Sequence, residues 1–498
     1  MNLTANIKRI FINTASYLYI LLFTYAAVTK LLDYNDFSIQ IGQSPLLSAF
    51  AGFVAIAVPV TELLIVLLLS IPRSRSTGLY LSLCLMVMFT TYIFLILNFS
   101  SNIPCSCGGI LEKMGWTEHL VFNIGCIVLA LVALLMDRSG WPNNLRPKNF
   151  ALAMVAGLLF SVAAIIALYL ISESIIHTRN NFVRRFPAHA RPELKKVDLQ
   201  HNSYYFAGLH DDKIYLANNT TPLNITIYDT ALQTKKQIRI TIEGPDVPYR
   251  SLQVRIIPPY FFVLDGSTPF IYRGNIKDWK ARPIKGNIPG FNFAEPMDSA
   301  RLVYRRINSR QSVNELGILE VNGQVTKKLN PGLLEKQVDG IFDTDGMMLY
   351  NSTQDKVHYV YYYRNQFITA GSELNLISKR KTIDTVSRAV ISTGTFSDGA
   401  RTMSSPPLLI NRLAAIDGNF LFINSERLGK YEDSGMAGDA SVFDLYNADT
   451  GTYQGSMYVY HIADHKVKSF RVSGNRMYAI SGTYLSVIEI SPKLANME

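Results

Sequence analysis

The chain has 498 residues, of which 48% are hydrophobic and only 17% are charged, and its formal net charge is +10. A soluble domain carries about 25% charged residues, and here three long stretches have no Asp, Glu, Lys or Arg: 10–29, 77–111 and 149–172. Apolar runs of this length can cross a bilayer. The composition therefore excludes a soluble cytoplasmic enzyme and a disordered chain. The basic excess does not indicate nucleic-acid binding, because much of it flanks the apolar stretches.

The hydropathy pattern predicts five membrane-spanning helices. Each is close to the length of ~20 residues that is needed to cross ~30 Å of hydrocarbon. The first is too long for the apolar region of a signal peptide, and four more follow it. The expected spans cover residues 10–32, 46–71, 78–98, 118–136 and 149–172.

Basic residues in the short loops predict the orientation, because Lys and Arg accumulate on the cytoplasmic side. They precede the first span and recur after the second and the fourth: Lys8, Arg9, Arg73, Arg75, Arg138, Arg146 and Lys148. We therefore expect a bacterial inner-membrane protein with a cytoplasmic N-terminus, and with everything after residue 172 in the periplasm. Arg179, Arg184 and Arg185 oppose this assignment, but long domains translocate largely regardless of charge.

All four cysteines lie in the membrane half, and two of them form a Cys105-Ser-Cys107 pair in an outer loop. Bridging cysteines one residue apart closes a small strained ring, and strained, exposed disulfides are the easily reduced, catalytic or regulatory ones. The adjacent Gly108 and Gly109 allow the backbone angles that such a ring demands. We predict that Cys105 and Cys107 are catalytic. The alternatives are two plain loop thiols, or a metal pair completed by His119; we expect no metal.

The other two cysteines and one carboxylate lie inside the predicted spans. Cys84 and Cys126 differ in depth by roughly 9 Å at 1.5 Å per residue, too far for a disulfide, so we expect buried apolar side chains. Glu62 is the only ionisable residue inside the second span, and a membrane carboxylate is costly enough to suggest a functional site. An interhelical hydrogen bond that fixes the bundle is an equal alternative. Snorkelling or a local ion pair accounts for Lys30 and Asp33, which close the first span.

Four short motifs connect this half of the chain to a known family. They are Lys30-Leu-Leu-Asp-Tyr-Asn-Asp-Phe37, Gln43-Ser-Pro-Leu-Leu47, Pro59-Val-Thr-Glu62 and Cys105-Ser-Cys-Gly-Gly109. Residues 8–137 resemble the MauE branch of the DoxX-like membrane proteins, a four-helix bundle. The family is named for methylamine utilisation and is associated with maturation of a disulfide-rich periplasmic dehydrogenase subunit. The resemblance implies a redox role, and it places the family's cysteine pair at Cys105 and Cys107 and its span-two glutamate at Glu62.

Hydropathy, charge and cysteine content divide the chain into four parts. Residues 1–137 are the four-helix membrane domain, and 138–172 are a cytoplasmic loop with the fifth span. Residues 173–197 are polar and basic and are expected to be a linker. Residues 198–498 contain no cysteine, so this part cannot perform thiol exchange itself.

The last part has the pattern of an all-β propeller. Short strands alternate with turn signals, and no long amphipathic helix interrupts them. A unit of roughly 47 residues recurs, close to a four-stranded blade, with longer intervals that suggest insertions around 391–407 and 425–440. Its copies begin near Tyr204, Leu252, Arg301, Gly346, Leu413 and Val467. We expect six blades, with seven as the alternative, and closure by a strand near 200–207 pairing with 484–490.

Two functions follow from this organisation. In the first, Cys105 and Cys107 exchange disulfides with an extracytoplasmic protein or peptide that the propeller holds, in support of that partner's maturation. By analogy with other four-helix thiol oxidases a quinone would accept the electrons, although no residue demands this cofactor. In the second, the protein is a non-enzymatic scaffold or assembly and export subunit. The lipid bilayer is the other expected partner, and nucleic acid is not one. A propeller hydrolase or dehydrogenase ranks last, because no catalytic motif supports it.

Overall fold

In the computed structural model the chain forms two compact units. One comprises Met1–Thr178 with Ile391–Pro407, and the other comprises Arg179–Val390 with Leu408–Glu498. The structure describes residues 3–43, 50–99, 115–137, 147–176, 181–186, 194–244, 248–322, 325–397, 399–433 and 435–490.

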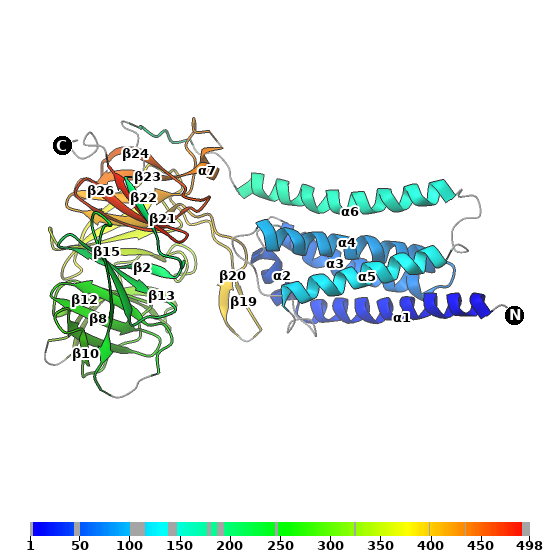
Figure 1. The fold of residues 1–498 in the computed structure, drawn as a ribbon, viewed down its shortest axis with the longest axis horizontal. Helices are drawn as coiled ribbons and strands as arrows, with labels where there is room; N and C mark the ends of the chain where they lie inside the picture. Colours follow the sequence, from blue (N-terminus) through cyan, green and yellow to red (C-terminus); the bar gives the residue numbers. More distant parts are fainter. Residues whose placement is uncertain are drawn as a thin grey trace. The chain divides into compact units, whose positions relative to one another are not determined.

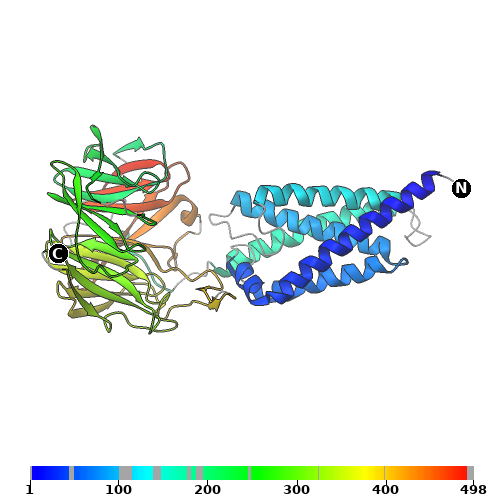
Figure 2. The ribbon, with the colours of Figure 1, turned by 90° about the horizontal axis from the view of Figure 1, so that it is seen from below.

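The first unit is built from long apolar helices that run alongside one another (Figures 1 and 2). They are α1 (Leu3–Leu32), α3 (Ala51–Ser70), α4 (Arg75–Phe99), α5 (Trp116–Met136) and α6 (Pro147–Ile176). All five are long and apolar enough to cross a membrane, which confirms the five predicted spans. The sequence did not predict α2 (Tyr34–Gln43), a short helix where a loop was expected; it buries Phe37, Ile39 and Ile41 against the unit.

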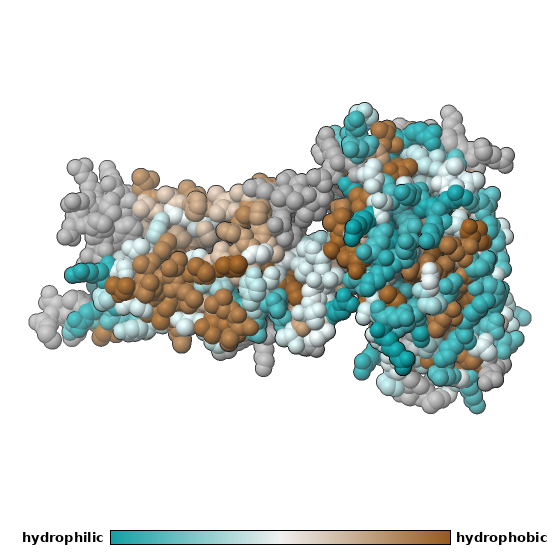
Figure 3. Space-filling view, turned by 180° about the vertical axis from the view of Figure 1, so that it is seen from behind, coloured by the Kyte–Doolittle hydropathy of each residue, from teal (hydrophilic) through white to brown (hydrophobic). Residues whose placement is uncertain are grey.

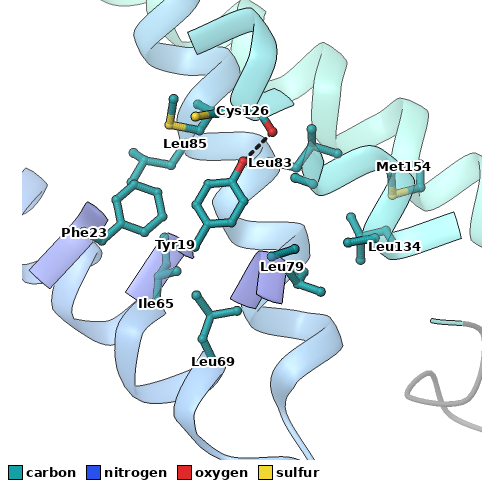
Figure 4. Close-up of a cluster of buried hydrophobic side chains, with 14 residues drawn as sticks. Tyr19, Phe23, Ile65, Leu69, Leu79, Leu83, Leu85, Cys126, Leu134 and Met154 are labelled. Carbon is teal, nitrogen blue, oxygen red and sulfur yellow. Dashed lines mark hydrogen bonds between the residues drawn. The ribbon is translucent and has the colours of Figure 1, made fainter. Parts of the chain in front are cut away.

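The outer and inner surfaces of this unit differ as a membrane requires. Large apolar side chains such as Leu21 and Phe53 are 73% and 74% exposed, because lipid rather than water surrounds them. Figure 3 shows apolar residues gathered over the helices. Between the helices, Tyr19, Phe23 and Leu79 belong to a tightly buried cluster (Figure 4).

The second unit is a propeller of six four-stranded blades, which confirms the predicted class and decides between six and seven. The first three blades are β2 (Tyr204–His210), β3 (Lys213–Asn218), β4 (Asn224–Asp229) and β5 (Lys235–Arg239); β7 (Gln253–Ile257), β8 (Tyr260–Asp265), β9 (Phe270–Asn275) and β10 (Lys280–Pro283), with the two-residue β6 (Thr241–Ile242) beside β10; and β11 (Phe293–Pro296), β12 (Arg301–Asn308), β13 (Val313–Glu320) and β14 (Thr326–Asn330).

The last three blades follow the same meander. They are β15 (Gly346–Asn351), β16 (Lys356–Tyr361), β17 (Gln366–Gly371) and β18 (Leu376–Lys381); β21 (Asn411–Asp417), β22 (Phe420–Ser425), β23 (Ala440–Asn447) and β24 (Tyr453–Tyr460); and β25 (Val467–Ser473), β26 (Arg476–Ser481) and β27 (Tyr484–Glu489), completed by β1 (Lys195–Asp198).

The strand that closes the ring differs from the prediction. It is β1, which pairs antiparallel with β27, Lys195 opposite Val487 and Asp198 opposite Tyr484. Residues 200–207 were the wrong choice, because they follow β1 and their second half, 204–207, belongs to β2, the first strand of the first blade. The reason is physical: β1 is an exposed, lysine-rich edge strand, so it lacks the apolar pattern by which a buried strand is recognised. By pairing with β27, β1 covers the edge that β27 would otherwise leave free.

The third blade also starts earlier than its repeat suggested. The copy expected at Arg301 is β12, and the blade begins with β11 at Phe293. This strand has only four residues and ends in Pro296. A proline in a short strand removes a ladder donor and weakens the strand signal, so the repeat was recognised one strand late.

The two intervals in which insertions were expected contain extra elements. In the chain segment that connects the fourth blade to the fifth, β19 (Thr393–Thr395) and β20 (Arg401–Met403) form a hairpin. This hairpin belongs to the helical unit. The backbone N–H and the hydroxyl of Ser397 donate to the Asp36 carboxylate of α2, at 3.0 and 2.7 Å. Inside the fifth blade, α7 (Met436–Asp439) precedes β23.

Candidate functional site

The site predicted from the sequence has two parts, and only one can be placed. Cys105 and Cys107 lie outside the described residues, in the interval between α4 and α5. His119 lies on α5. Within the described residues no group of three or more His, Cys, Asp or Glu side chains could hold a metal ion.

Glu62 lies on α3, three residues after Pro59, and its side chain is fully buried between helices. Its Oε1 accepts a hydrogen bond from Lys30 Nζ of α1 at 2.5 Å, and the lysine side chain is only 16% exposed. The ammonium group also lies 5.8 Å from the ring centroid of Phe37 and 5.6 Å from that of Phe89. Pairing with an opposite charge lowers the cost of burying a carboxylate in a membrane helix.

The structure thus identifies a residue whose role the sequence left open. Lys30 is an interhelical partner of Glu62, 32 positions away. Snorkelling or a pair with Asp33 was sufficient to explain it within one span. The signal that could have found the pair is a rule of exclusion: a single carboxylate in one span requires a cation, and Lys30 is the only Lys or Arg of the first expected span, 10–32.

A cavity of about 550 Å³ adjoins the pair. Helices α1, α3, α4 and α5 supply most of its walls, and their contribution is almost entirely apolar and aromatic. The polar residues on the wall include Lys30, Glu62, His119 and Asn123. Cavities of about 300–1,000 Å³ with a few convergent polar groups are typical of small-molecule sites.

The two cysteines inside the spans are not bridged to each other. Cys84 is half-buried and Cys126 is buried, and both are free thiols. Cys126 packs in the apolar cluster that contains Tyr19, whose hydroxyl donates to the Cys126 carbonyl at 2.5 Å (Figure 4). Both thiols fit the expected structural role of small apolar groups.

In the propeller, the buried charges stabilise the fold. Arg184 follows α6 and is buried against the fifth blade. Its guanidinium donates to Asp444 at 2.7 Å and to Glu432 at 2.6 Å. Burial alone would lower the pKa of Arg184, but these two carboxylates raise it above its ordinary value. The neighbouring Phe186 stacks on Tyr458 with ring centroids 4.4 Å apart. Part of the predicted linker is therefore an anchored segment of the propeller unit.

The buried histidine of the fourth blade is likewise structural. His358 is inaccessible, and its Nδ1 lies 3.1 Å from the Thr369 hydroxyl. Burial lowers the pKa of His358 to about 4, so the ring is neutral at physiological pH. Among the described residues no carboxylate is hydrogen-bonded to His358, and its Nε2 has no hydrogen-bond partner.

Residues 8–136 match the family model described as methylamine utilisation protein MauE. This MauE region is about a quarter of the chain, and it contains Lys30, Glu62, Cys105 and Cys107. No curated protein matches the chain.

Several solved structures are similar at low identity. A member of the DUF4221 family from Bacteroides vulgatus is 13% identical, with 63% of this chain and 98% of that chain covered and a TM-score of 0.40. An exported protein from Bacteroides fragilis is 10% identical, with 63% and 100% covered and a TM-score of 0.36. Regucalcin from Agrobacterium tumefaciens, a calcium-binding protein, is 10% identical, with 63% and 95% covered and a TM-score of 0.35. Similarities at this level transfer no ligand or activity to this chain.

Proposed function

We propose that this multi-pass membrane protein exchanges disulfides with an extracytoplasmic partner through Cys105 and Cys107. The observation that carries the proposal is the Cys105-Ser-Cys107 pair inside a region that matches MauE, in an interval between two membrane helices. The other cysteines support the assignment by exclusion. Cys84 and Cys126 lie among helices, and the propeller has none.

The exchange conserves atoms and electrons. A partner thiolate attacks one sulfur of the Cys105–Cys107 disulfide, and a mixed disulfide forms as the other cysteine leaves as a thiolate. The partner's second thiolate then attacks the mixed disulfide, so the partner is oxidised and Cys105 and Cys107 are reduced. Restoring the disulfide removes two electrons and two protons. A quinone would accept both and become a quinol.

The orientation belongs to the same proposal. The basic loops that flank the first, second and fourth spans support a cytoplasmic N-terminus in a bacterial inner membrane. The cysteine pair and the propeller then share the periplasmic side, where disulfides persist. The propeller would hold the partner and raise its effective concentration near the cysteines. The anchored segment 181–186 supports this role, because it leaves few residues between α6 and the first contact with the fifth blade.

Labelling with a membrane-impermeant maleimide tests the assignment. After mild reduction of intact spheroplasts, Cys105 and Cys107 should be labelled, while Cys84 and Cys126 should be spared because forming a thiolate in hydrocarbon is penalised. Without reduction, labelling should be weak. The Cys105→Ser/Cys107→Ser double variant is the matched control and should give no label. Equal labelling of all four cysteines would contradict the proposal and favour the scaffold.

A further inference from the structure

We infer that the cavity beside Glu62 binds the ring of a membrane-soluble hydroquinone, a quinol, with one ring hydroxyl donating to Glu62 Oε2. This inference rests on the proposed function, in which a quinone accepts the electrons, and it adds the place where the reduced carrier binds. The cavity, an unpartnered acceptor and the neutrality of the Lys30–Glu62 pair carry it.

Within the described part of the chain, Glu62 has one hydrogen-bond acceptor without a partner. Oε1 of Glu62 is bonded to Lys30, but Oε2 is buried and has no hydrogen-bond partner among the described residues. A buried carboxylate oxygen without a partner is costly, of the order of 1–3 kcal/mol or more. Because Glu62 lines the cavity, a hydrogen-bond donor bound there would remove this cost.

The charges of the pair select a neutral ligand. Lys30 and Glu62 cancel, so an anionic headgroup would gain no net attraction and would meet the unpaired Oε2. A hydroxyl group suits the pair because it can donate to Oε2 and also accept from Lys30 Nζ, which has three protons and gives one to Oε1.

The walls select a ring with an apolar tail. Phe37, Phe89 and Trp116 line the cavity and offer aromatic faces and edges to a flat ring. Leu21 and Phe53 also line it, and both are strongly exposed on the lipid-facing surface. A chain attached to the ring can therefore continue into the bilayer. Phe23 and Leu85, labelled in Figure 4, connect this wall to the buried cluster.

The test compares two ligands that differ at their two ring oxygens, which carry protons in one ligand and methyl groups in the other. The full chain in phosphatidylcholine nanodiscs is titrated with decylubiquinol or with its dimethyl ether, under argon, and quenching of tryptophan fluorescence reports binding near Trp116. The quinol should bind at least tenfold more tightly than the ether. The Lys30→Met/Glu62→Leu double variant removes both charges together, and it should lose this discrimination while circular dichroism shows unchanged helix content.

Equal binding of quinol and ether would overturn the inference, because it would show that the hydroxyl protons are not recognised. Discrimination that persists in the double variant would also overturn it. The Cys105→Ser/Cys107→Ser variant should bind the quinol as the native chain does. If the protein binds quinol and ether equally while Cys105 and Cys107 are still labelled by the maleimide as expected, the cavity inference fails and the thiol-exchange proposal stands.

Discussion

Glu62→Lys should prevent the chain from accumulating in the membrane, whereas combining it with Lys30→Glu should restore accumulation. The single change places two ammonium groups together where the native pair is 2.5 Å apart and the glutamate is fully buried. Breaking a buried pair costs about 3–5 kcal/mol, and an unpaired cation in a membrane helix costs roughly 2.5–3.5 kcal/mol on insertion scales. The reversed pair, with the lysine on α3 and the glutamate on α1, recovers most of both free-energy costs.

Quantitative immunoblotting of membrane fractions measures this result. Glu62→Gln is the isosteric control and should accumulate well, because the amide can still accept a hydrogen bond from Lys30. If Glu62→Lys alone were stable and active, Glu62 would face water or headgroups, and its burial in the bundle would be wrong.

Arg184→Ala should destabilise the propeller more than any other single change in residues 181–186. The substitution leaves Asp444 and Glu432 buried without their shared cation, and it also removes the bond from Arg184 to the Arg427 carbonyl at 2.9 Å. We expect a loss of about 3–5 kcal/mol. For a domain of this size that corresponds to a fall of roughly 5–8 °C in Tm.

Thermal unfolding of a fragment spanning residues 179–498 measures the effect. Arg185→Ala is the matched control: Arg185 is exposed, and its guanidinium lies over the Tyr453 ring at 5.4 Å. That change should cost about 1 kcal/mol or less. Similar Tm values for the two variants would contradict the account of Arg184 as a buried anchor.

Sequence reasoning found the parts of the fold that have either a characteristic length or a repeated pattern. Five apolar runs of membrane length could be located because hydrocarbon thickness sets their length. The blades could be counted because each repeats the same alternation. The misplaced elements have weak signals: β1 is polar because it is an edge, β11 is short and ends in proline, and α2 is only ten residues long.

In the candidate site, too, residues with a strong local signal were found and their distant partners were not. Glu62 could be recognised because a charge inside a span is rare. Its partner was not assigned, because Lys30 lies on another helix and helix packing brings the two together; only an argument by exclusion, rather than local sequence, connects them. The role of Arg184 was hidden for a similar reason. It is one of several basic residues in a polar stretch, and the carboxylates that bury it are 248 and 260 positions away.

The central claim is that Cys105 and Cys107 exchange disulfides with a partner, and trapping the mixed disulfide tests it most directly. Cys105→Ser and Cys107→Ser leave one thiol each, and its thiolate can attack the disulfide of an oxidised partner molecule. A mixed disulfide forms as one partner sulfur leaves as a thiolate, and the second cysteine that would resolve it from this chain is missing. Membranes are quenched with acid, alkylated and separated without reductant. The account predicts a higher-mass species that reductant dissolves, that is absent from the Cys105→Ser/Cys107→Ser control, and whose second component contains cysteine. Normal abundance of both single variants with no such species, and with full biological function retained, would contradict the account.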